Sequence, residues 1–124
     1  MLSIRLIKTE SWFNLMPGSS PTFNMNGELV LINNSGLNIE NFGIDEITLS
    51  SSGKEYYRFA PDYEPDKTLL QPGDSTVIKF SADPPLKIKD DSQIRESFDI
   101  LFVVFADKMK SDFLLENHLP EKAY

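Results

Sequence analysis

Cysteine is absent from this chain of 124 residues, and several kinds of chemistry are absent with it. Without thiols the chain has no disulfide, no cysteine nucleophile, no zinc finger and no cysteine-ligated iron–sulfur cluster. A chain of this length can still bury a real core, because about two-thirds of its surface leaves water on folding. We therefore expect one domain over residues 1–124 that folds without covalent or metal cross-links.

Basic residues are also scarce. The chain has 12 Lys and Arg against 19 Asp and Glu, which gives a formal net charge of −7 at pH 7. An excess of negative charge repels phosphate backbones and anionic lipid headgroups. Nucleic acids and membrane surfaces are therefore not expected partners.

Long hydrophobic runs are missing. The longest, Ile100 to Ala106, is far shorter than the roughly 18 residues of a membrane-spanning helix. The first eight residues are interrupted by Arg5 and Lys8, so they lack the apolar centre of a signal peptide. We expect no membrane span, and we expect residues 97–107, which contain this run, to form a buried strand.

Catalytic motifs are missing as well. The single histidine, His118, lies in a C-terminal tail that we expect to fray from about residue 117. Serine catalysis needs a nucleophile, a base and an orienting group, and Gly18-Ser19-Ser20 lacks the G-x-S-x-G pattern of a nucleophile elbow. Glycine-rich phosphate loops do not occur. The sequence predicts a protein that is not an enzyme and has no cofactor, no catalytic residue and no metal site.

What the chain does have is apolar alternation with a period of two. In residues 75–81, Thr76, Ile78 and Phe80 fall on one face of a half-buried strand. The same reasoning predicts six further strands, over residues 2–8, 27–32, 42–50, 55–59, 97–107 and 110–115. Turn-forming residues separate them at 17–21, 33–36, 51–54 and 72–74. Short strands without helical periodicity predict an all-β antiparallel sandwich of about seven to nine strands, with at most a short helical turn near residues 87–92.

Strand alternation also predicts the core. Ile78, Phe80, Ile100 and Phe102 should share its centre. The strand at residues 98–106 is apolar on both faces, so Leu101, Val103 and Phe105 should face away from that core. We expect a cover for this outer face: either the segment Trp12–Met16 folding across it, which we favour, or a second copy or partner protein.

Three segments carry a family resemblance. Leu29-Val-Leu-Ile-Asn-Asn-Ser-Gly36, Leu70-Gln-Pro-Gly-Asp-Ser-Thr-Val-Ile-Lys-Phe80 and Phe98-Asp-Ile-Leu-Phe-Val-Val-Phe105 follow one another with turns between strands. This order resembles immunoglobulin-like domains of bacterial surface and envelope proteins, and is similar to intracellular-proteinase-inhibitor-like domains. The resemblance implies an immunoglobulin-like sandwich over roughly residues 27–107, and it implies no functional residue.

The segment Pro61–Pro72 is the longest expected irregular connection, a type that is often functional. It could be presented to a protease as an inhibitory loop. Its alternating Asp62, Glu64 and Asp66 could direct oxygens at calcium, as could the pair Asp90–Asp91, but the pattern departs from a calcium loop because Pro65 interrupts it and Lys67 follows, so we favour a solvated loop. A carboxylate-based hydrolase is a further alternative.

Two further features are candidate functional sites: a polar turn and a set of aromatic residues. Asn33-Asn34-Ser35 matches a glycosylation sequon, but a turn explains all three residues. Five aromatic residues form the candidate binding set: Trp12, Phe13, Tyr57, Tyr63 and Phe105. The sequence thus favours a non-catalytic protein-interaction or assembly module whose partner is another protein or a second copy. The alternatives are a protease-inhibitor-like domain and a carboxylate-based calcium binder or hydrolase.

Overall fold

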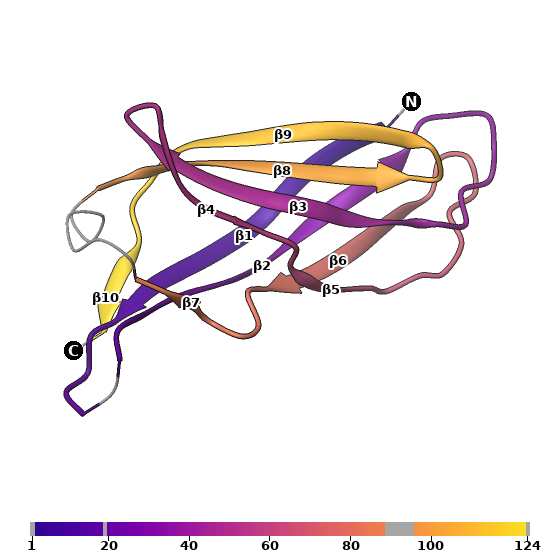
Figure 1. The fold of residues 1–124 in the computed structure, drawn as a ribbon. Helices are drawn as coiled ribbons and strands as arrows, with labels where there is room; N and C mark the ends of the chain where they lie inside the picture. The colour runs from indigo at the N-terminus through magenta and orange to yellow at the C-terminus, as the bar shows by residue number, and fades with distance from the viewer. Residues whose placement is uncertain (1, 19, 89–95, 124) are drawn as a thin grey trace.

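The computed structural model describes residues 2–18, 20–88 and 96–123, which form two β-sheets packed face to face (Figure 1). One sheet has six strands, in the order β10-β1-β2-β6-β5, with β7 also paired to β2. The other has four, in the order β4-β3-β8-β9. All pairings are antiparallel except that of β1 with β10. The strands are β1 (Leu2–Asn14), β2 (Thr22–Asn33), β3 (Phe42–Ser51), β4 (Lys54–Phe59), β5 (Asp62–Pro65), β6 (Ser75–Ser81), β7 (Leu86–Lys87), β8 (Phe98–Ala106), β9 (Met109–His118) and β10 (Glu121–Ala123).

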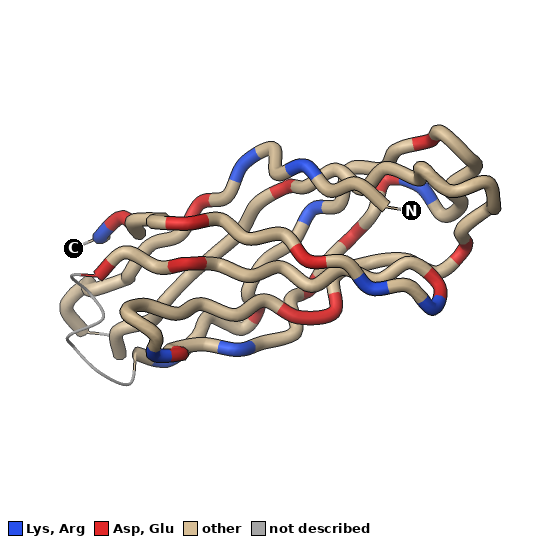
Figure 2. Tube along the Cα trace, turned by 90° about the horizontal axis from the view of Figure 1, so that it is seen from above, with Lys and Arg blue, Asp and Glu red and all other residues tan. Residues whose placement is uncertain are grey.

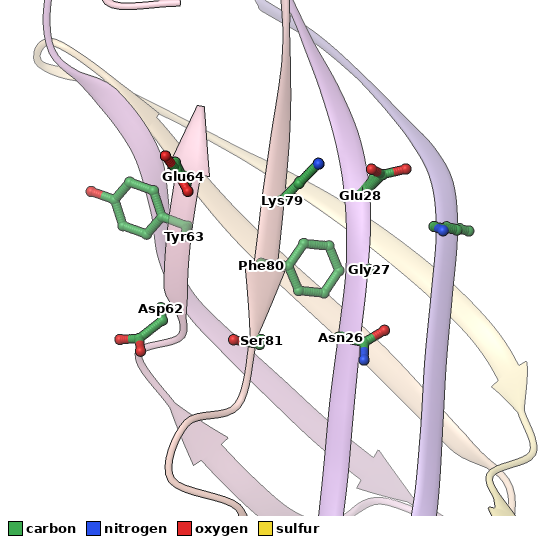
Figure 3. A pocket seen from close by; sticks show the side chains of 10 residues that line it. Asn26, Gly27, Glu28, Asp62, Tyr63, Glu64, Lys79, Phe80 and Ser81 are labelled. Carbon is green, nitrogen blue, oxygen red and sulfur yellow. The ribbon is translucent and has the colours of Figure 1, made fainter. Parts of the chain in front are cut away.

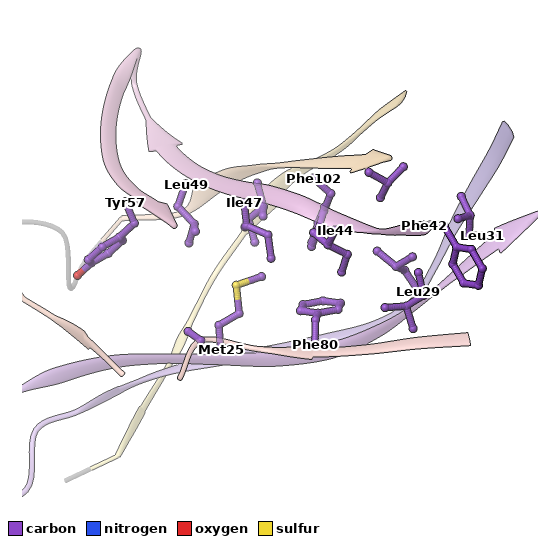
Figure 4. Packing of buried hydrophobic residues seen from close by; sticks show 14 of the residues in the cluster. Met25, Leu29, Leu31, Phe42, Ile44, Ile47, Leu49, Tyr57, Phe80 and Phe102 are labelled. Atoms are coloured by element: carbon purple, nitrogen blue, oxygen red, sulfur yellow. The ribbon is translucent and has the colours of Figure 1, made fainter. Parts of the chain in front are cut away.

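The core lies between the two sheets and is built by strand alternation. Met25, Leu29 and Phe80 point into it from the six-stranded sheet, toward Ile47 and Phe102 of the four-stranded sheet (Figure 4). In β8 every second residue from Phe98 to Ala106 is fully buried, and the residues between them are half-buried. The predicted β-sandwich is confirmed, and the four residues predicted for its centre are all buried.

The strand bounds differ from the prediction most in β1. It continues to Asn14, although its apolar alternation stops near Lys8. The cause is a β-bulge between Leu6 and Lys8, after which Thr9, Ser11 and Phe13 point inward instead of the even-numbered residues. Phe13 is therefore a core residue, and a pattern search that assumes unbroken alternation ends the strand too early.

Two segments expected to be irregular form strands. Part of the connection Pro61–Pro72 is β5, which extends the six-stranded sheet beyond β6. The C-terminal tail, expected to fray, continues β9 to His118 and then forms β10 beside β1. In both cases the pairing partner is distant in sequence, so no local sequence pattern predicts the strand. The described residues contain ten strands and no helix, and the helical turn expected near residues 87–92 falls largely outside them.

Candidate functional site

One side of the sandwich carries two strands whose outer edges are unpaired along most of their length. Among the described strands β9 pairs only with β8, and β10 covers β1 only at Trp12–Asn14. The chain leaves β9 and crosses to the six-stranded sheet at this side (Figure 1). There, His118 Nε2 lies 2.5 Å from Ser11 Oγ. We call this the open side, defined by Leu2–Ser11 of β1 and by β9. A sheet edge leaves a row of backbone N–H and C=O groups without partners.

The open side also has apolar side chains that the sandwich covers incompletely. These residues contact the core but keep part of their surface exposed; they are Leu2, Ile4 and Leu6 of β1 with Phe113 and Leu115 of β9. The Phe113 ring lies 6.2 Å from the ring of Phe102, measured between centroids. Ile7, at the β1 bulge, is 48% exposed. A strand added at either edge would cover apolar surface as well as satisfy backbone groups.

The opposite side of the sandwich is closed by an aromatic contact. Tyr63 of β5 lies over Gly43 of β3, and its ring meets that of Phe105 edge-on at 6.4 Å. A Cβ on Gly43 would lie 2.6 Å from the Tyr63 hydroxyl oxygen, so the absence of a side chain there permits the contact. Phe105 is therefore covered by Tyr63, and the preferred cover, Trp12–Met16, was wrong. That segment belongs to the other sheet, where Trp12 lies opposite Asn24.

The five aromatic residues of the candidate binding set are not brought together. Phe13 and Tyr57 are 0% and 5% exposed, and the Tyr57 ring stacks on Phe23 with centroids 5.0 Å apart. Trp12 is half-buried on β1, where β10 pairs with it. Only Tyr63 and Phe105 touch each other. A binding role for these residues stays a prediction, but they do not form one surface patch.

The outer faces of the two sheets differ in chemistry. On the six-stranded sheet, Lys8, Glu28, Lys79 and Glu64 stand in register across four strands with alternating charge. They border a groove of about 670 Å³ (Figure 3). Cross-strand neighbours of opposite charge stabilise a solvated sheet face. On the four-stranded sheet Leu101 and Val103 are half-buried, and Leu114 beside Leu101 is 50% exposed.

Charged residues of both signs are distributed over the described molecule, as Figure 2 shows along the chain trace. The exposed ion pairs include Lys110 with Asp45 at 3.0 Å and Arg58 with Glu46 at 2.9 Å. Exposed pairs of this kind contribute about 0–1 kcal/mol each. They therefore shape the surface more than they hold the fold.

The three carboxylates of the candidate calcium segment, Asp62, Glu64 and Asp66, have different neighbours. Asp66 accepts hydrogen bonds from the Thr76 hydroxyl at 2.7 Å and from the Val77 amide at 3.1 Å, and the hydroxyl is the main reason that its pKa is lowered. Asp62 and Glu64 lie beside Ser81 and Lys79 of β6. Among the described residues, no three His, Asp or Glu side chains are grouped so that they could hold a metal ion. The pair Asp90–Asp91 lies outside the described residues.

The contact between Ser11 and His118 is the feature that sequence reasoning missed. The two residues are 107 positions apart and come together because the tail follows β1. They line a cavity of about 420 Å³, together with Thr9, Glu10, Trp12, Leu119 and Glu121. Ser11 is buried, and burial lowers the pKa of His118. The imidazole is therefore mostly neutral near pH 7, and the tautomer decides whether Nε2 accepts the hydrogen bond from the Ser11 hydroxyl or donates it.

Comparisons with known proteins add a distant likeness. No family model matches the chain, and no curated protein matches it. Among solved structures, it is similar to the archaellum periplasmic stator protein FlaG from Sulfolobus acidocaldarius, at 12% identity and a TM-score of 0.47. The match covers 93% of this chain and 100% of the FlaG chain. No helix in the described residues could cross a membrane.

Proposed function

We propose that this chain is a non-catalytic protein-interaction or assembly module that binds other protein chains at its open side. The observation that carries the proposal is the pair of unpaired strand edges, β1 and β9, with half-buried apolar side chains beside them. An exposed edge binds an extended partner segment through main-chain hydrogen bonds, and neighbouring apolar side chains give it selectivity. Both parts of such a site are present on the open side.

We also infer that the sandwich is a variant of the immunoglobulin-like fold. The support is the strand order, since β1-β2-β6-β5 and β4-β3-β8-β9 follow the A-B-E-D and C′-C-F-G arrangement of that fold. The additional β10 pairs in parallel with the first strand. This chain has no cysteine for the bridge found in antibody domains, and its one tryptophan, Trp12, is on the first strand rather than in the third. An experimental structure with another strand order would contradict the assignment.

The protease-inhibitor alternative has less support. An inhibitory loop must be presented to the protease, whereas much of Pro61–Pro72 is tied to the sandwich. Asp62–Pro65 pairs with β6, and Leu70 is buried and exchanges backbone hydrogen bonds with Ile39 at 2.8 and 2.9 Å. The calcium-binding alternative lacks a cluster of ligands in the described residues. We therefore favour the interaction module.

Site-specific photocrosslinking in the cells of origin tests the proposal. A photoreactive amino acid would replace Leu114 on β9 or Ile7 on β1, and Leu69, which is 38% exposed in the connection between β5 and β6, is the control because β2 separates those two strands from β1. We expect a discrete adduct with protein from position 114 or position 7, and none from position 69. An adduct of twice the chain mass would identify a second copy, and another mass would identify a different protein. Equal, background labelling at all three positions would refute the proposed binding side.

A further inference from the structure

The two edges of the open side are not equally suited to pairing. The β1 edge is interrupted by the bulge between Leu6 and Lys8, and bulges are one of the devices that protect sheet edges. The β9 edge is regular from Met109 to Leu115, and the first irregularity comes at Asn117, whose φ is 57°. The β9 edge is therefore the better template for a partner strand.

Hairpin geometry shows which backbone groups β9 offers. A two-residue turn joins β8 to β9, with Ala106 opposite Met109. In such a hairpin the residues that flank the turn bond to each other, and every second residue after them directs its N–H and C=O away from the partner strand. The outward backbone groups of β9 thus belong to Lys110, Asp112, Leu114 and Glu116.

The charges along this edge are complementary to themselves in one long antiparallel register. If two β9 strands pair about a two-fold axis at Phe113, Lys110 lies opposite the partner's Glu116, and symmetry repeats that pair. An axis at Asp112 places that carboxylate against its own copy. An axis at Leu114 places Asp112 against the partner's Glu116. Like charges directly opposite destabilise a sheet, so these two neighbouring registers are disfavoured.

The same register suits the side chains on the inner face. Phe113 meets the partner's Phe113 at a position where neither residue bonds across the new interface, and such pairs bring side chains closest together. Phe113 is half-buried beside Phe102, so its exposed part faces the open side. Pairing would cover the ring on that side.

We propose that this chain forms a two-fold symmetric dimer in which two β9 strands pair antiparallel about Phe113 and join the four-stranded sheets into one continuous sheet. This inference rests on the proposed function and names a second copy as the occupant of one edge. We choose a second copy because the charges of β9 are complementary to those of another β9 strand: Lys110 lies near one end of the strand and Glu116 near the other.

Charge reversal tests the pairing in solution. Glu116→Lys should weaken dimerisation roughly tenfold, because two attractive pairs become repulsive. The double variant Lys110→Glu/Glu116→Lys should restore it in large part, since the pairs across the interface are exchanged, while the ion pair of Lys110 with Asp45 within one chain is lost. The matched control is Lys87→Glu/Glu40→Lys, which makes the same exchange at exposed positions away from the edge. Sedimentation equilibrium over a concentration series measures the dissociation constant, and thermal melts check that each variant folds.

Disulfide trapping tests the register. Because the chain has no cysteine of its own, every disulfide that forms must involve the introduced cysteine. Opposed residues without cross-strand hydrogen bonds have Cα atoms about 4.5 Å apart, within the range that a disulfide spans. Phe113→Cys should therefore form a disulfide dimer on mild oxidation. Ser111→Cys and Leu115→Cys should each give no disulfide-linked dimer alone, but the two variants should cross-link when they are mixed.

Several outcomes would overturn the dimer. A wild-type chain that stays monomeric at millimolar concentration would do so, and so would a dimer whose affinity Glu116→Lys leaves unchanged. A disulfide formed by Ser111→Cys alone would also refute it, because the axis would then lie elsewhere. If the chain is monomeric but photocrosslinking at position 114 captures another protein, the dimer fails while the proposed function stands.

Discussion

Asn33 is the polar residue on which the end of β2 depends. Its carboxamide is fully buried; the nitrogen donates to the Leu37 and Leu70 carbonyl oxygens at 2.8 and 3.1 Å, and the oxygen accepts from the Ser35 amide and hydroxyl at 2.9 and 2.6 Å. The Asn33 side chain therefore joins the turn to the distant segment at Leu70. Of the two roles that the sequence allowed, glycosylation acceptor and turn residue, the buried carboxamide fits the turn.

Asn33→Ala should lower the free energy of unfolding by about 2–4 kcal/mol, because it leaves buried carbonyl groups and a turn amide without their partner. Asn34→Ala is the matched control: Asn34 is exposed and bonds only to the Ser3 hydroxyl in the described contacts, so the cost should be within about 0.5 kcal/mol. Urea denaturation of both variants measures the difference. Equal midpoints for the two would contradict the assigned role.

His118 should make stability depend on pH in a defined window. Burial lowers its pKa below the ordinary value of 6.5, so the unfolded chain binds a proton at a pH where the folded chain does not. The contribution of His118 to the free energy of unfolding is therefore fully present above about pH 6.5, and it decreases as the pH falls toward the lowered pKa. Glu10 and Glu121 line the same cavity, and the pKa of His118 is nevertheless lowered, with burial as the cause.

The single histidine makes this measurable by NMR titration of one imidazole. His118→Gln should remove the decline that begins below about pH 6.5, which lies above the pH range in which Glu55 and Asp66, whose pKa values are also lowered, take up protons. Ser11→Ala keeps the histidine and should keep a decline. An imidazole that titrates above 6.5 in the folded protein would reverse the expected sign and contradict the argument.

At the scale of elements, the β1 bulge and Gly27 depend on each other. Gly27 lies opposite Thr9, just past the bulge, and a Cβ on it would meet the Lys8 carbonyl oxygen and lie 2.6 Å from Cζ of Phe80. The Lys8 oxygen is backbone and cannot rotate away. Gly27 thus allows β1 to shift its register and still let Phe80 pack over β2.

Gly27→Ala should therefore cost about 1–3 kcal/mol by overpacking, although alanine is ordinarily acceptable in a strand. Gly36→Ala is the control, because nothing lies within 4 Å of a Cβ at that position. Thermal unfolding compares the two. A Gly27→Ala protein as stable as the Gly36→Ala protein would show that β1 adjusts without loss.

The elements also show what local sequence could predict. Residues 75–81 were predicted as a strand with both bounds correct, because alternation between Thr76 and Phe80 is unbroken and a proline-glycine turn precedes it. Strands β5 and β10 were not predicted, since each is short and exists only because a distant strand offers an edge. The pairs that define the candidate sites, Ser11 with His118 and Tyr63 with Phe105, are likewise set by topology. Periodicity assigns a residue to a face, but only the strand order assigns it a neighbour.

At the scale of the whole molecule, the two sides of the sandwich differ in how far they are covered. Tyr63 closes one side by covering Phe105 and Gly43. The other side ends in the outer edges of β1 and β9, where the only pairing among the described strands is that of β10 with Trp12–Asn14. Stability and association should therefore respond to different residues. Phe105 belongs to the closed side and Glu116 to the open side.

Phe105→Asp should destabilise the folded chain by about 1–3 kcal/mol, because it replaces a half-buried ring under Tyr63 by a carboxylate, with only the exposed Lys110 opposite as a partner. Its dimerisation should weaken less than that of Glu116→Lys, since the proposed interface does not use the Phe105 ring and the new carboxylate faces Lys110 without reversing its charge. Glu116→Lys should do the reverse, with weaker association and an unchanged denaturation midpoint at concentrations where both proteins are monomeric. Chemical denaturation and sedimentation measured on the same samples separate the two effects. Loss of association by Phe105→Asp at unchanged stability would instead place the contact between copies on the outer face of the four-stranded sheet.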